Sequence, residues 1–576
     1  MSPVIKGEAR RHQLVTTYGV GSVVALGDES FMVAGLEYWQ VGDEPNIHEP
    51  RLERELRVQG FVDPPASGDD RRPDIPVVRF PDMHSCPECK RLALHDRFTS
   101  YDGNRCGVCE ELLIPSRFVV ACQNGHIDDF PYFRWVHAGS RPTGDEHELR
   151  LETSGTTASL RDVVVSCSCG QEMSLDGAFR AAALRGVATC TGRSPWLRSK
   201  TAGCKEVPRT LQRGASNAWY PLLRSALSIP PWSEAAFQKI NRHWWVLRAV
   251  PEDALGDTLR GLFGDKMGGF SLGDLVDAVM LRKRDLGDDG QMRGESGIRQ
   301  EEYEALSRGR VETPSRQDFV CEPVGITDTT LTRWFRRVMS VTRLREVRAL
   351  ESFTRVLPPG PADGPERRAA LCESDIGWLP AIEVQGEGVF LAVDQDRLAR
   401  WETDPAVVQR VRPIHDRYRA RFAALKKDPD REVTPRLVLL HTLAHLLILQ
   451  WSLDCGYPTA ALRERIYAGP TMAGILIYTA TTDSAGSLGG VVGLSEPKRL
   501  QRAMAEMAER SAWCSSDPLC SESTAAGVDS LNLAACHACT LLPEVSCEEM
   551  NVLLDRATVV DTPGAPPIGF LEGKYD

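Results

Sequence analysis

The apolar and polar residues near the N-terminus predict a β-hairpin. Residues 22–26 form a mostly apolar run after the glycines of YGVGS, and the apolar run FMVAGLEYW follows a turn at Gly27 and Asp28. Two short apolar runs separated by a glycine-containing turn are typical of a hairpin. We therefore expect the N-terminal segment to be rich in strands.

The pattern near the C-terminus predicts an α/β core. LVLLHTLAHLLILQW, at residues 437–451, is apolar on nearly every face and predicts a helix packed on all sides. GILIYTA, at residues 474–480, predicts a buried strand. RLQRAMAEMAERSAW, at residues 499–513, has apolar residues at three- and four-residue intervals, as an amphipathic helix does.

Stretches rich in proline, glycine and charge indicate linkers or long loops at residues 62–76, 285–317, 357–367 and 561–569. No fixed-period repeat is present. We expect a mixed, α+β, multi-domain protein that contains zinc-ribbon-like cysteine modules. Its predicted regions are an N-terminal strand-rich segment (1–80), a cysteine-rich zinc-binding region (81–210), a mainly helical middle region (211–356), a mixed α/β connector (357–432) and a C-terminal zinc-binding domain (433–576).

Composition narrows the class of protein. The chain has 576 residues, of which 42% are hydrophobic and 26% are charged, as is usual for globular proteins. The 68 Lys and Arg residues against 79 Asp and Glu residues give a net charge of −11. This balance excludes a basic protein that coats nucleic acid, so any contact with DNA needs local basic patches.

The N-terminus has no apolar signal sequence, and the longest apolar run, residues 437–449, is short for a membrane span and contains two histidines. We expect a cytoplasmic protein without a membrane span. Because the cytosol is reducing, the 17 cysteines favour metal ligands or buried thiols over disulfides.

The first cysteine set predicts a structural zinc site. Cys86-x2-Cys89 and Cys106-x2-Cys109 have the spacing of two knuckles that close a tetrahedral thiolate site, and the segment between them can return as a hairpin with residues 101–104 at its tip. Four thiolates leave no open coordination position, which disfavours a catalytic metal. The alternative is four free cysteines.

Two further sets could each close a zinc site. The second set is Cys167, Cys169, Cys190 and Cys204. Its spacing is looser, and buried structural thiols are its alternative. The third set is Cys520, Cys536, Cys539 and Cys547, with Cys514 as an alternative to Cys520. Altogether the sequence predicts two to three structural zinc ions.

Two smaller groups carry possible metal or acid–base chemistry. In CQNGHIDD, Cys122 and His126 are followed by Asp128 and Asp129, but a structural turn with a hydrogen-bonded histidine is the favoured interpretation because no fourth ligand lies nearby in sequence. His441 and His445 lie one helical turn apart, as in zinc peptidases, although Thr442 replaces the glutamate that serves as general base. We therefore favour two histidines packed in a core.

The sequence lacks the common motifs of nucleotide-driven and hydrolytic enzymes. The chain has no GxxxxGK[ST] phosphate-binding loop and no G-x-S-x-G elbow. The glycine-rich residues 484–493 contain no lysine, so a structural turn is favoured over a phosphate site. We expect no ATP hydrolysis by the chain itself, and we assign no catalytic residue.

The stretch from residue 333 to 355 is strongly basic, with only Glu346 and Glu351 opposing its arginines. It could contact phosphate, but a solvated helix face or an interface with an acidic partner fits equally well. The DNA-binding candidates are Arg333, Arg336, Arg337, Arg343, Arg345 and Arg348. The arginines of residues 410–421 form a second, similar candidate.

Several longer segments together resemble the DrmB family of the bacterial anti-phage system DISARM, over nearly the whole chain. They are RRHQLVTTYGVGSVVALGDESFMVAGLEYW, CQNGHIDDFPYFRWVH, RLREVRALESFTRV, GWLPAIEVQGEGVFL, HTLAHLLI, ILIYTATTDSAGSLGG and ACHACTLLPEVSC. The last block also resembles the zinc-binding domain at the end of some DExH-type helicases. Those helicases commonly carry D-x-x-P-G-G where this chain has TTDSAGSLGG, which puts a shared role of that loop in doubt.

The resemblance implies a non-catalytic zinc protein that acts beside a DrmA-like helicase and supports its contact with DNA, with no membrane and no small-molecule substrate. The alternative is an independent zinc-dependent nucleic-acid-processing enzyme that uses the Cys122 and His126 group or the His441 and His445 pair.

Overall fold

The structure is a computed structural model. It describes residues 7–42, 44–65, 74–98, 103–140, 147–153, 159–264, 267, 269–287, 294–310, 318–327, 329–359, 364–424, 428–429, 431–479, 490–527 and 530–575. Most of the glycine-rich stretch at residues 484–493, the tip residues 101–102 and large parts of the expected linkers lie outside these ranges.

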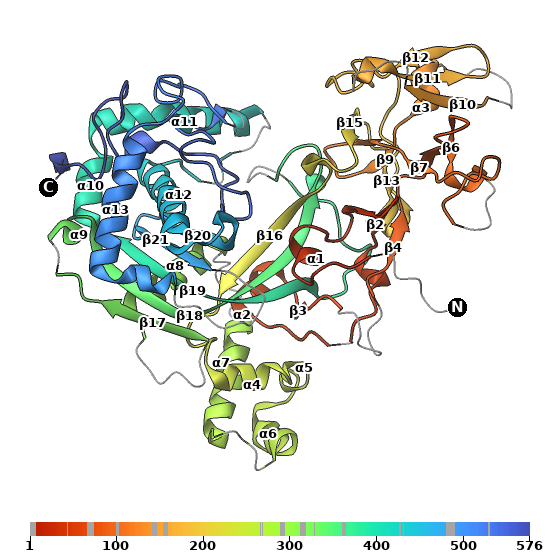
Figure 1. The fold of residues 1–576 in the computed structure, drawn as a ribbon. Helices are drawn as coiled ribbons and strands as arrows, with labels where there is room; N and C mark the ends of the chain where they lie inside the picture. Colours follow the sequence, from red (N-terminus) through yellow and green to blue (C-terminus); the bar gives the residue numbers. More distant parts are fainter. Residues whose placement is uncertain are drawn as a thin grey trace. The chain divides into compact units, whose positions relative to one another are not determined.

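The chain forms two compact units, each built from separate stretches of sequence (Figure 1). Unit 1 contains residues 1–47, 58–224 and 349–382, and unit 2 contains residues 48–57, 225–348 and 383–576. Three of the five boundaries fall within strands, namely β16 (Tyr220–Leu227), β18 (Phe335–Thr354) and β19 (Leu379–Val393). The five regions predicted from the sequence are continuous stretches of chain, whereas each structural unit is assembled from three separate stretches.

Unit 1 consists mainly of short strands. Its short helices are α1 (Gln13–Thr16) and α3 (Tyr132–Val136). Its strands are β1 (Val23–Leu26), β2 (Glu29–Val33), β3 (Phe61–Val62), β4 (Val77–Arg79), β5 (Met83–Ser85), β6 (Arg91–Leu94), β7 (Ile114–Pro115), β8 (Phe118–Ala121), β9 (Ile127–Asp129), β10 (Leu149–Thr153), β11 (Val163–Cys167), β12 (Glu172–Ser174), β13 (Arg193–Ser194), β14 (Ser199–Lys200) and β15 (Arg209–Gln212). They form sheets in the orders β1-β2-β4, β12-β11-β10-β6-β5-β7, β13-β14 and β15-β8-β9.

The predicted N-terminal hairpin is confirmed. β1 and β2 pair antiparallel with Leu26 opposite Glu29, and Gly27 between them has a φ of 62°. Glycine adopts this left-handed conformation without the steric cost that a Cβ atom brings. The predicted turn therefore needs glycine at position 27 because the backbone there is left-handed.

Unit 2 combines helices with the long strands. Its helices are α2 (Pro50–Leu56), α4 (Ala235–Asn241), α5 (Trp244–Leu247), α6 (Leu255–Phe263), α7 (Leu272–Gly287), α8 (Gly294–Arg308), α9 (Thr329–Trp334), α10 (Gln395–Glu402), α11 (Pro405–Ala424), α12 (Pro435–Cys455) and α13 (Pro497–Ala512). Its further strands are β17 (Phe319–Val324), β20 (Leu462–Tyr467) and β21 (Gly474–Thr479). The large sheet has the order β16-β18-β19-β21-β20, with β17 paired to β18 and β3 to β19.

The three elements predicted near the C-terminus are confirmed as α12, β21 and α13, and α12 packs against β20, β21 and α13. α12 is buried along most of its length, which is why it is apolar all round. Among the described residues it is the one helix long and apolar enough to cross a membrane, and its burial is typical of a core helix.

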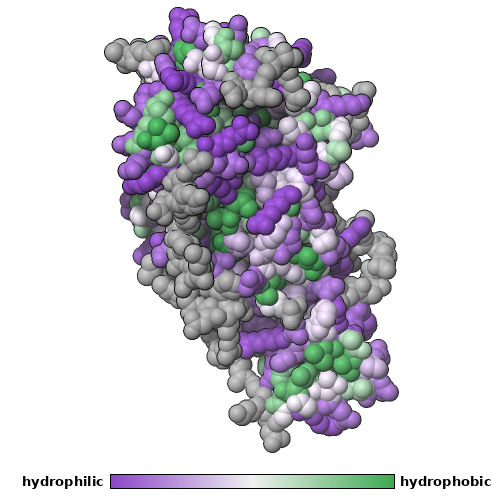
Figure 2. Space-filling model, turned by 90° about the vertical axis from the view of Figure 1, so that its right-hand side faces the viewer, coloured by the Kyte–Doolittle hydropathy of each residue, from purple (hydrophilic) through white to green (hydrophobic). Residues whose placement is uncertain are grey.

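The helices α4, α5, α6 and α7 share a separate apolar core in which Trp244 and Leu259 are buried. Figure 2 shows hydrophobic positions gathered at its lower end, where Figure 1 places these helices. Two consecutive residues of α5, Trp245 and Val246, are 44% and 43% exposed. This part of the predicted middle region is helical, as expected.

The basic stretch adopts a conformation other than the helix considered from sequence. Residues 335–354 form the long strand β18, which pairs with β17 through a register shift at Val320 and Cys321. The C-terminal half of β18 is buried on both faces, so its charged residues point into the protein rather than along a solvated surface. Burial on both faces removes the polar alternation by which a half-exposed strand is recognised.

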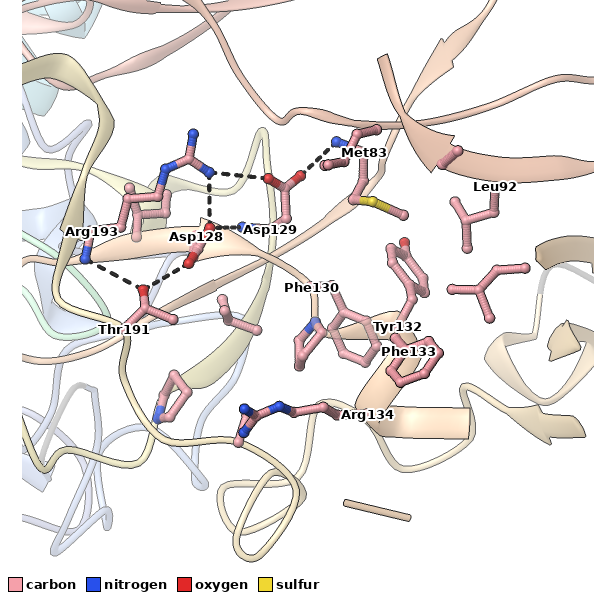
Figure 3. A pocket seen from close by; sticks show the side chains of 18 of the residues that line it. Met83, Leu92, Asp128, Asp129, Phe130, Tyr132, Phe133, Arg134, Thr191 and Arg193 are labelled. Carbon is pink, nitrogen blue, oxygen red and sulfur yellow. Dashed lines mark hydrogen bonds and ion pairs between the residues drawn. The ribbon is translucent and has the colours of Figure 1, made fainter. Parts of the chain in front are cut away.

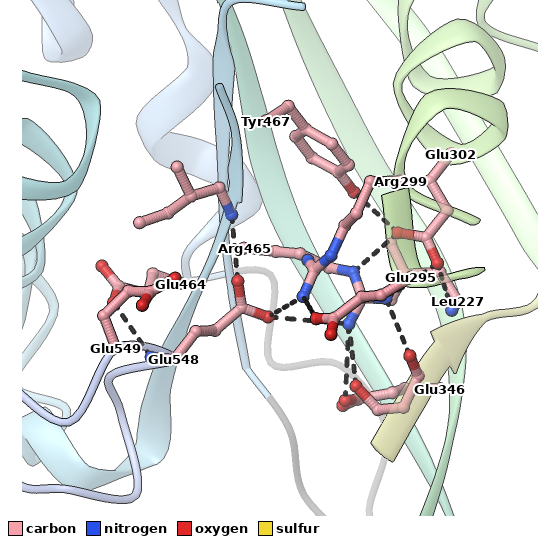
Figure 4. A network of polar contacts seen from close by, with 12 residues as sticks. Leu227, Glu295, Arg299, Glu302, Glu346, Glu464, Arg465, Tyr467, Glu548 and Glu549 are labelled. Carbon is pink, nitrogen blue, oxygen red and sulfur yellow. Dashed lines mark hydrogen bonds and ion pairs between the residues drawn. The ribbon is translucent and has the colours of Figure 1, made fainter. Parts of the chain in front are cut away.

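Buried ion pairs link the strands of unit 2 to helix α8. Arg465 on β20 contacts both carboxylate oxygens of Glu302 on α8, at 2.7 Å and 2.8 Å, and all these side chains are fully buried. Glu302 also accepts hydrogen bonds from the backbone N–H of Leu227 at 2.9 Å and from the hydroxyl of Tyr467 at 3.3 Å. Figure 4 shows Glu302 and Arg465 at the centre of this network. Two opposite charges can be buried here because their hydrogen-bonding capacity is met.

Candidate metal centres

The described residues contain five groups of four side chains whose potential ligand atoms lie within 4.8 Å of one another. Cluster 1 is Cys86, Cys89, Cys106 and Cys109; cluster 2 is Cys122, His126, Cys190 and Cys204; cluster 3 is His137, His147, Cys167 and Cys169; cluster 4 is Cys514, Cys520, Cys536 and Cys539; cluster 5 is His441, His445, Glu464 and Cys547. Clusters 1 to 3 lie in unit 1, and clusters 4 and 5 lie in unit 2. Sulfur and imidazole donors in sets of four are those that zinc prefers.

Cluster 1 consists of two equivalent knuckles. The N–H of Lys90 donates to the Cys86 carbonyl at 3.0 Å, and the N–H of Glu110 donates to the Cys106 carbonyl at 2.9 Å. Lys90 and Glu110 both adopt positive φ values, 61° and 59°. The two turns bring Cys89 Sγ to 3.9 Å from Cys106 Sγ. These four cysteines, grouped from their spacing alone, come together in the structure.

Cluster 2 is built on the tight turn between β8 and β9. Cys122 Sγ lies 3.5 Å from His126 Nδ1, and Cys190 Sγ lies 3.5 Å from Cys122 Sγ and 3.6 Å from His126 Nδ1. The Asn124 side-chain amide donates to Cys204 Sγ at 3.7 Å. The hydrogen bond with Cys190 is the main cause that lowers the pKa of Cys122, which favours the thiolate that metals bind. Cys122 and His126 thus belong to a four-ligand set.

Cluster 3 joins two histidines to the C-x-C pair. His137 Nε2 lies 3.3 Å from Cys169 Sγ, and His147 Nδ1 lies 3.2 Å from Cys167 Sγ. His137 Nδ1 donates to the Phe133 carbonyl at 2.7 Å, which leaves Nε2 unprotonated toward the cluster. The hydrogen bond from the Gln171 backbone is the main cause that lowers the pKa of Cys169 to about 6.

The second set expected from sequence is therefore divided in the structure. Cys167 and Cys169 lie with two histidines, whereas Cys190 and Cys204 lie with Cys122 and His126. The physical reason is that β11 ends in one sheet while the segment that carries Cys190 runs beside the β8–β9 turn. Sequence reasoning missed His137 and His147 because both are far in sequence from their sulfur partners.

Cluster 4 follows directly after α13. Cys514 Sγ lies 3.6 Å from Cys536 Sγ, and Cys520 and Cys536 each lie 3.7 Å from Cys539 Sγ. The sequence offered Cys514 and Cys520 as alternatives, but the structure brings both to the same cluster and directs Cys547 to cluster 5. The loop is held by Asp517, both of whose carboxylate oxygens accept from Arg556 at 2.6 Å. The hydrogen bond with Cys520 lowers the pKa of Cys539 to about 5.

Cluster 5 surrounds the histidine pair of α12. Glu464 Oε1 on β20 lies 3.2 Å from His441 Nε2 and 3.4 Å from His445 Nε2, and His441 Nε2 lies 3.2 Å from Cys547 Sγ. Burial opposes ionisation of Glu464, but His445 and His441 outweigh it and hold the pKa of this carboxyl below its usual range. Glu464 carries no motif in the sequence, so only the strand register reveals it.

The two carboxylates after His126 do not join cluster 2. Asp128 and Asp129 contact Arg193 at 3.0 Å and 3.4 Å beside a cavity of about 1020 Å³ (Figure 3). The Asp129 side chain also accepts from the backbone N–H of Met83 at 2.8 Å. Burial raises the pKa of Asp129 to about 6. In this arrangement both carboxylates serve to hold Arg193.

The six candidate DNA-binding arginines divide by burial. Arg345 forms ion pairs with Glu383 and Asp318 and donates to Ser228, and Arg348 pairs with Glu346 at 2.7 Å. Both are buried, which removes them from contact with a phosphate backbone and corrects the expectation for these two. Arg343 is partly exposed, and the exposed members are Arg333, Arg336 and Arg337.

The second arginine stretch, on α11, is also partly structural. Arg410 pairs with the fully buried Asp555 at 2.7 Å, and Arg417 donates to the Ser530 carbonyl at 3.0 Å. Arg412 and Arg419 are exposed. The positive charge of this stretch thus serves partly to hold the C-terminal segment.

Comparison with known proteins assigns the family. Residues 443–540, which include all of cluster 4, match the MrfA Zn-binding domain (MZB), and residues 10–220 match a domain of unknown function, DUF8724. The DISARM protein DrmB of Bacillus paralicheniformis is 32% identical over 566 residues, which cover 95% of this chain and 99% of that protein. A zinc-binding C-terminal domain and the expected resemblance over nearly the whole chain are thereby confirmed. The chain belongs to the DrmB family of the DISARM anti-phage defence system.

Proposed function

We propose that this chain is a non-catalytic, zinc-binding accessory subunit that pairs with a DrmA-like helicase and supports DNA binding in DISARM defence. The observation that carries the proposal is the near-full-length similarity to DrmB. Four-ligand clusters on short turns support it further, because such clusters are typical of closed structural metal sites. Rigid knuckles of this kind can present a docking surface without performing chemistry.

The first experiment is co-purification of the full chain with the DrmA-like helicase of the same defence system at moderate salt. DNA-stimulated ATP hydrolysis is then measured for the helicase with and without the chain. A stable complex with altered DNA affinity or turnover is the expected result. Absence of a complex would contradict the pairing.

We place the DNA contact at the exposed arginines around the junction of α9 and β18. Arg333, Arg336 and Arg337 lie within five residues of one another, and each guanidinium can contact a phosphate group. The test variant is Arg333→Gln/Arg336→Gln/Arg337→Gln. Its matched control is Arg260→Gln/Arg502→Gln/Arg510→Gln, which removes the same charge from exposed positions on α6 and α13, outside both candidate arginine stretches.

The expected result is weaker DNA binding by the helicase complex and a flatter salt dependence for the first variant alone. Each lost phosphate contact changes the slope of log K against log salt by about 0.9 on duplex DNA. Equal slopes for the two variants would show a general effect of charge and would remove the assignment.

One observation favours the alternative of an independent nucleic-acid-processing enzyme, namely the cavity beside Asp128 and Asp129. Substitution of both by asparagine tests it, with DNA integrity followed in the absence of the helicase. ATP-independent change of DNA that requires these carboxylates would support an enzyme. Unchanged defence in cells would argue against one.

A further inference from the structure

Cluster 5 is a polar group inside the most apolar part of the molecule. His441, His445 and Glu464 are 0% exposed and Cys547 is 5% exposed. They lie between α12, β20 and the C-terminal segment, and Figure 4 shows Glu464 on the side of β20 opposite Arg465. Burial of a carboxylate and two imidazoles is costly unless their charges and hydrogen-bonding atoms are matched. The charges and hydrogen-bonding atoms of cluster 5 must therefore be matched by a partner within the core.

The hydrogen bonds around His445 determine which of its ring nitrogens faces the cluster. His445 Nδ1 lies 2.9 Å from the carbonyl oxygen of Thr540. A carbonyl oxygen can only accept, so Nδ1 carries the proton and donates it. In a neutral ring, Nε2 then presents a lone pair toward Glu464. Nε2 has no hydrogen-bond partner within the described structure, although it lies only 3.4 Å from Glu464 Oε1.

The carboxylate and the sulfur are prepared as acceptors as well. Glu464 Oε1 accepts from the backbone N–H of Glu548 at 3.1 Å, while Oε2 has no partner in the described part of the chain. Cys547 Sγ accepts from the backbone N–H groups of Glu549 at 3.3 Å and Asn551 at 3.2 Å. Backbone donors to sulfur favour the thiolate. Lone pairs of His445 Nε2, Glu464 and Cys547 thus face one another, which is favourable only with a proton or a metal cation among them.

We propose that His441, His445, Glu464 and Cys547 bind one divalent ion of the zinc type, as a second metal site of unit 2. A set of two nitrogens, one oxygen and one sulfur suits Zn²⁺ rather than Mg²⁺ or Ca²⁺, which prefer oxygen ligands. Four protein ligands close the coordination sphere, so the ion is structural. The MZB match includes His445 and Glu464 but neither His441 nor Cys547, so it does not cover this set.

The position of the site shows what the ion does. It joins α12 and β20, which follow each other closely in the chain, to the segment after cluster 4, which is far from both in sequence. The Thr540 carbonyl that orients His445 follows Cys539, a ligand of cluster 4, and the Thr540 hydroxyl lies 3.2 Å from Cys539 Sγ. A metal at cluster 4 therefore positions the group that orients a ligand of cluster 5. Groups that form hydrogen bonds to metal ligands alter the affinity of the site for the metal.

The test is the metal content of the full-length protein, measured by inductively coupled plasma mass spectrometry after desalting. The variants are Cys547→Ser and the double variant His441→Gln/His445→Gln. The matched control is Cys321→Ser, a buried thiol outside the five clusters whose sulfur contacts the Leu306 carbonyl at 3.5 Å. We expect both cluster 5 variants to lose one equivalent of metal per chain and the control to lose none. Unchanged metal content in both variants would overturn the site.

A measurement on the unaltered protein covers the case in which the variants fail to fold. Crystals of the wild-type chain are measured on both sides of the zinc absorption edge. The proposal requires an anomalous peak among the four ligand atoms of cluster 5. Peaks at clusters 1 and 4 without one at cluster 5 would show instead that a proton shared between a histidine and Glu464 satisfies the group.

Discussion

Clusters 1 and 5 each offer four ligands, but they differ both in ligand chemistry and in surroundings. Cluster 1 has four cysteines, and cluster 5 has two histidines, a glutamate and a cysteine. Around cluster 1 the apolar group consists largely of the cysteines themselves, with Phe98, Leu113 and Ala93 beside them. Around cluster 5 the helix α12 is buried along most of its length. A metal at cluster 1 would hold together two knuckles that have few apolar contacts besides their own cysteines, whereas a metal at cluster 5 would neutralise polar groups within a core that already exists.

The largest effect expected from this difference is on removal of metal. Treatment of the full chain with a strong chelator should expose residues 83–115 to solvent while α12 and β21 remain protected, because the apolar contacts of α12 persist without metal. Hydrogen–deuterium exchange with mass spectrometry measures both regions in one sample. Added zinc should restore protection. Loss of protection in α12 before the knuckles would reverse the comparison.

A single knuckle ligand gives the next largest effect. Cys89→Ser should lose one metal ion and destabilise the β5–β6–β7 region by several kcal/mol, since zinc binding supplies about 10–16 kcal/mol in zinc-finger peptides. Cys372→Ser is the matched control, a half-buried cysteine of the same unit outside the clusters. Metal content and local hydrogen exchange report the outcome. Equal behaviour of the two variants would mean that cluster 1 is a set of free thiols.

We expect the stability of unit 2 to depend more than that of unit 1 on buried ion pairs. Glu302→Gln removes the carboxylate nearest to the fully buried Arg465, at 2.7 Å, and leaves, among the described residues, only Glu548 at 3.7 Å and Glu346 at 4.0 Å. Breaking a buried pair costs about 3–5 kcal/mol. Denaturant unfolding followed by the fluorescence of unit 2 measures this loss. The control Arg260→Gln removes an exposed pair with Asp257 and should change stability by less than about 0.5 kcal/mol.

The same pair predicts a pH dependence. Burial raises the pKa of Glu302, but Arg465 and Arg299 outweigh burial and hold it below its ordinary value of 4.5. When folding lowers the pKa of a carboxyl, the carboxyl stabilises the protein fully at any pH above its ordinary pKa. This contribution is lost as the pH falls through the folded-state pKa. The stability difference between wild type and Glu302→Gln should therefore be constant above about pH 5 and shrink in more acidic solution. A difference that grows on acidification would contradict this.

The smallest expected effect is the coupling between clusters 4 and 5. Cys539→Ser should remove the cluster 4 ion and weaken binding at cluster 5 by about 10- to 100-fold, the range found for outer-sphere groups. Native mass spectrometry at graded chelator concentrations follows the ions, and comparison with Cys539→Ser/Cys547→Ser identifies the one at cluster 5. Cys109→Ser, in the other unit, is the control. Equal affinity at cluster 5 in Cys539→Ser and Cys109→Ser would exclude the coupling.

The sequence predicted features formed by residues that are close together in the chain and missed contacts between residues that are far apart in it. The C-x2-C knuckles, the N-terminal hairpin and α12 are local features, and the pattern predicted each of them. His147 reaches cluster 3 through the pairing of β10 with β11, His137 follows α3, and Glu464 lies on β20, which packs against α12. One sequence does not reveal these contacts. β18 was not recognised as a strand because burial of both its faces hides the alternation, and its arginines were interpreted as surface charge.

The most direct test of this account is the number of metal ions bound by the intact chain. Native mass spectrometry compared with the mass of the denatured chain gives that number. The account predicts five ions, one for each cluster. Two or three ions, as the cysteine spacing alone suggested, would contradict this prediction by leaving three or two of the five clusters without metal.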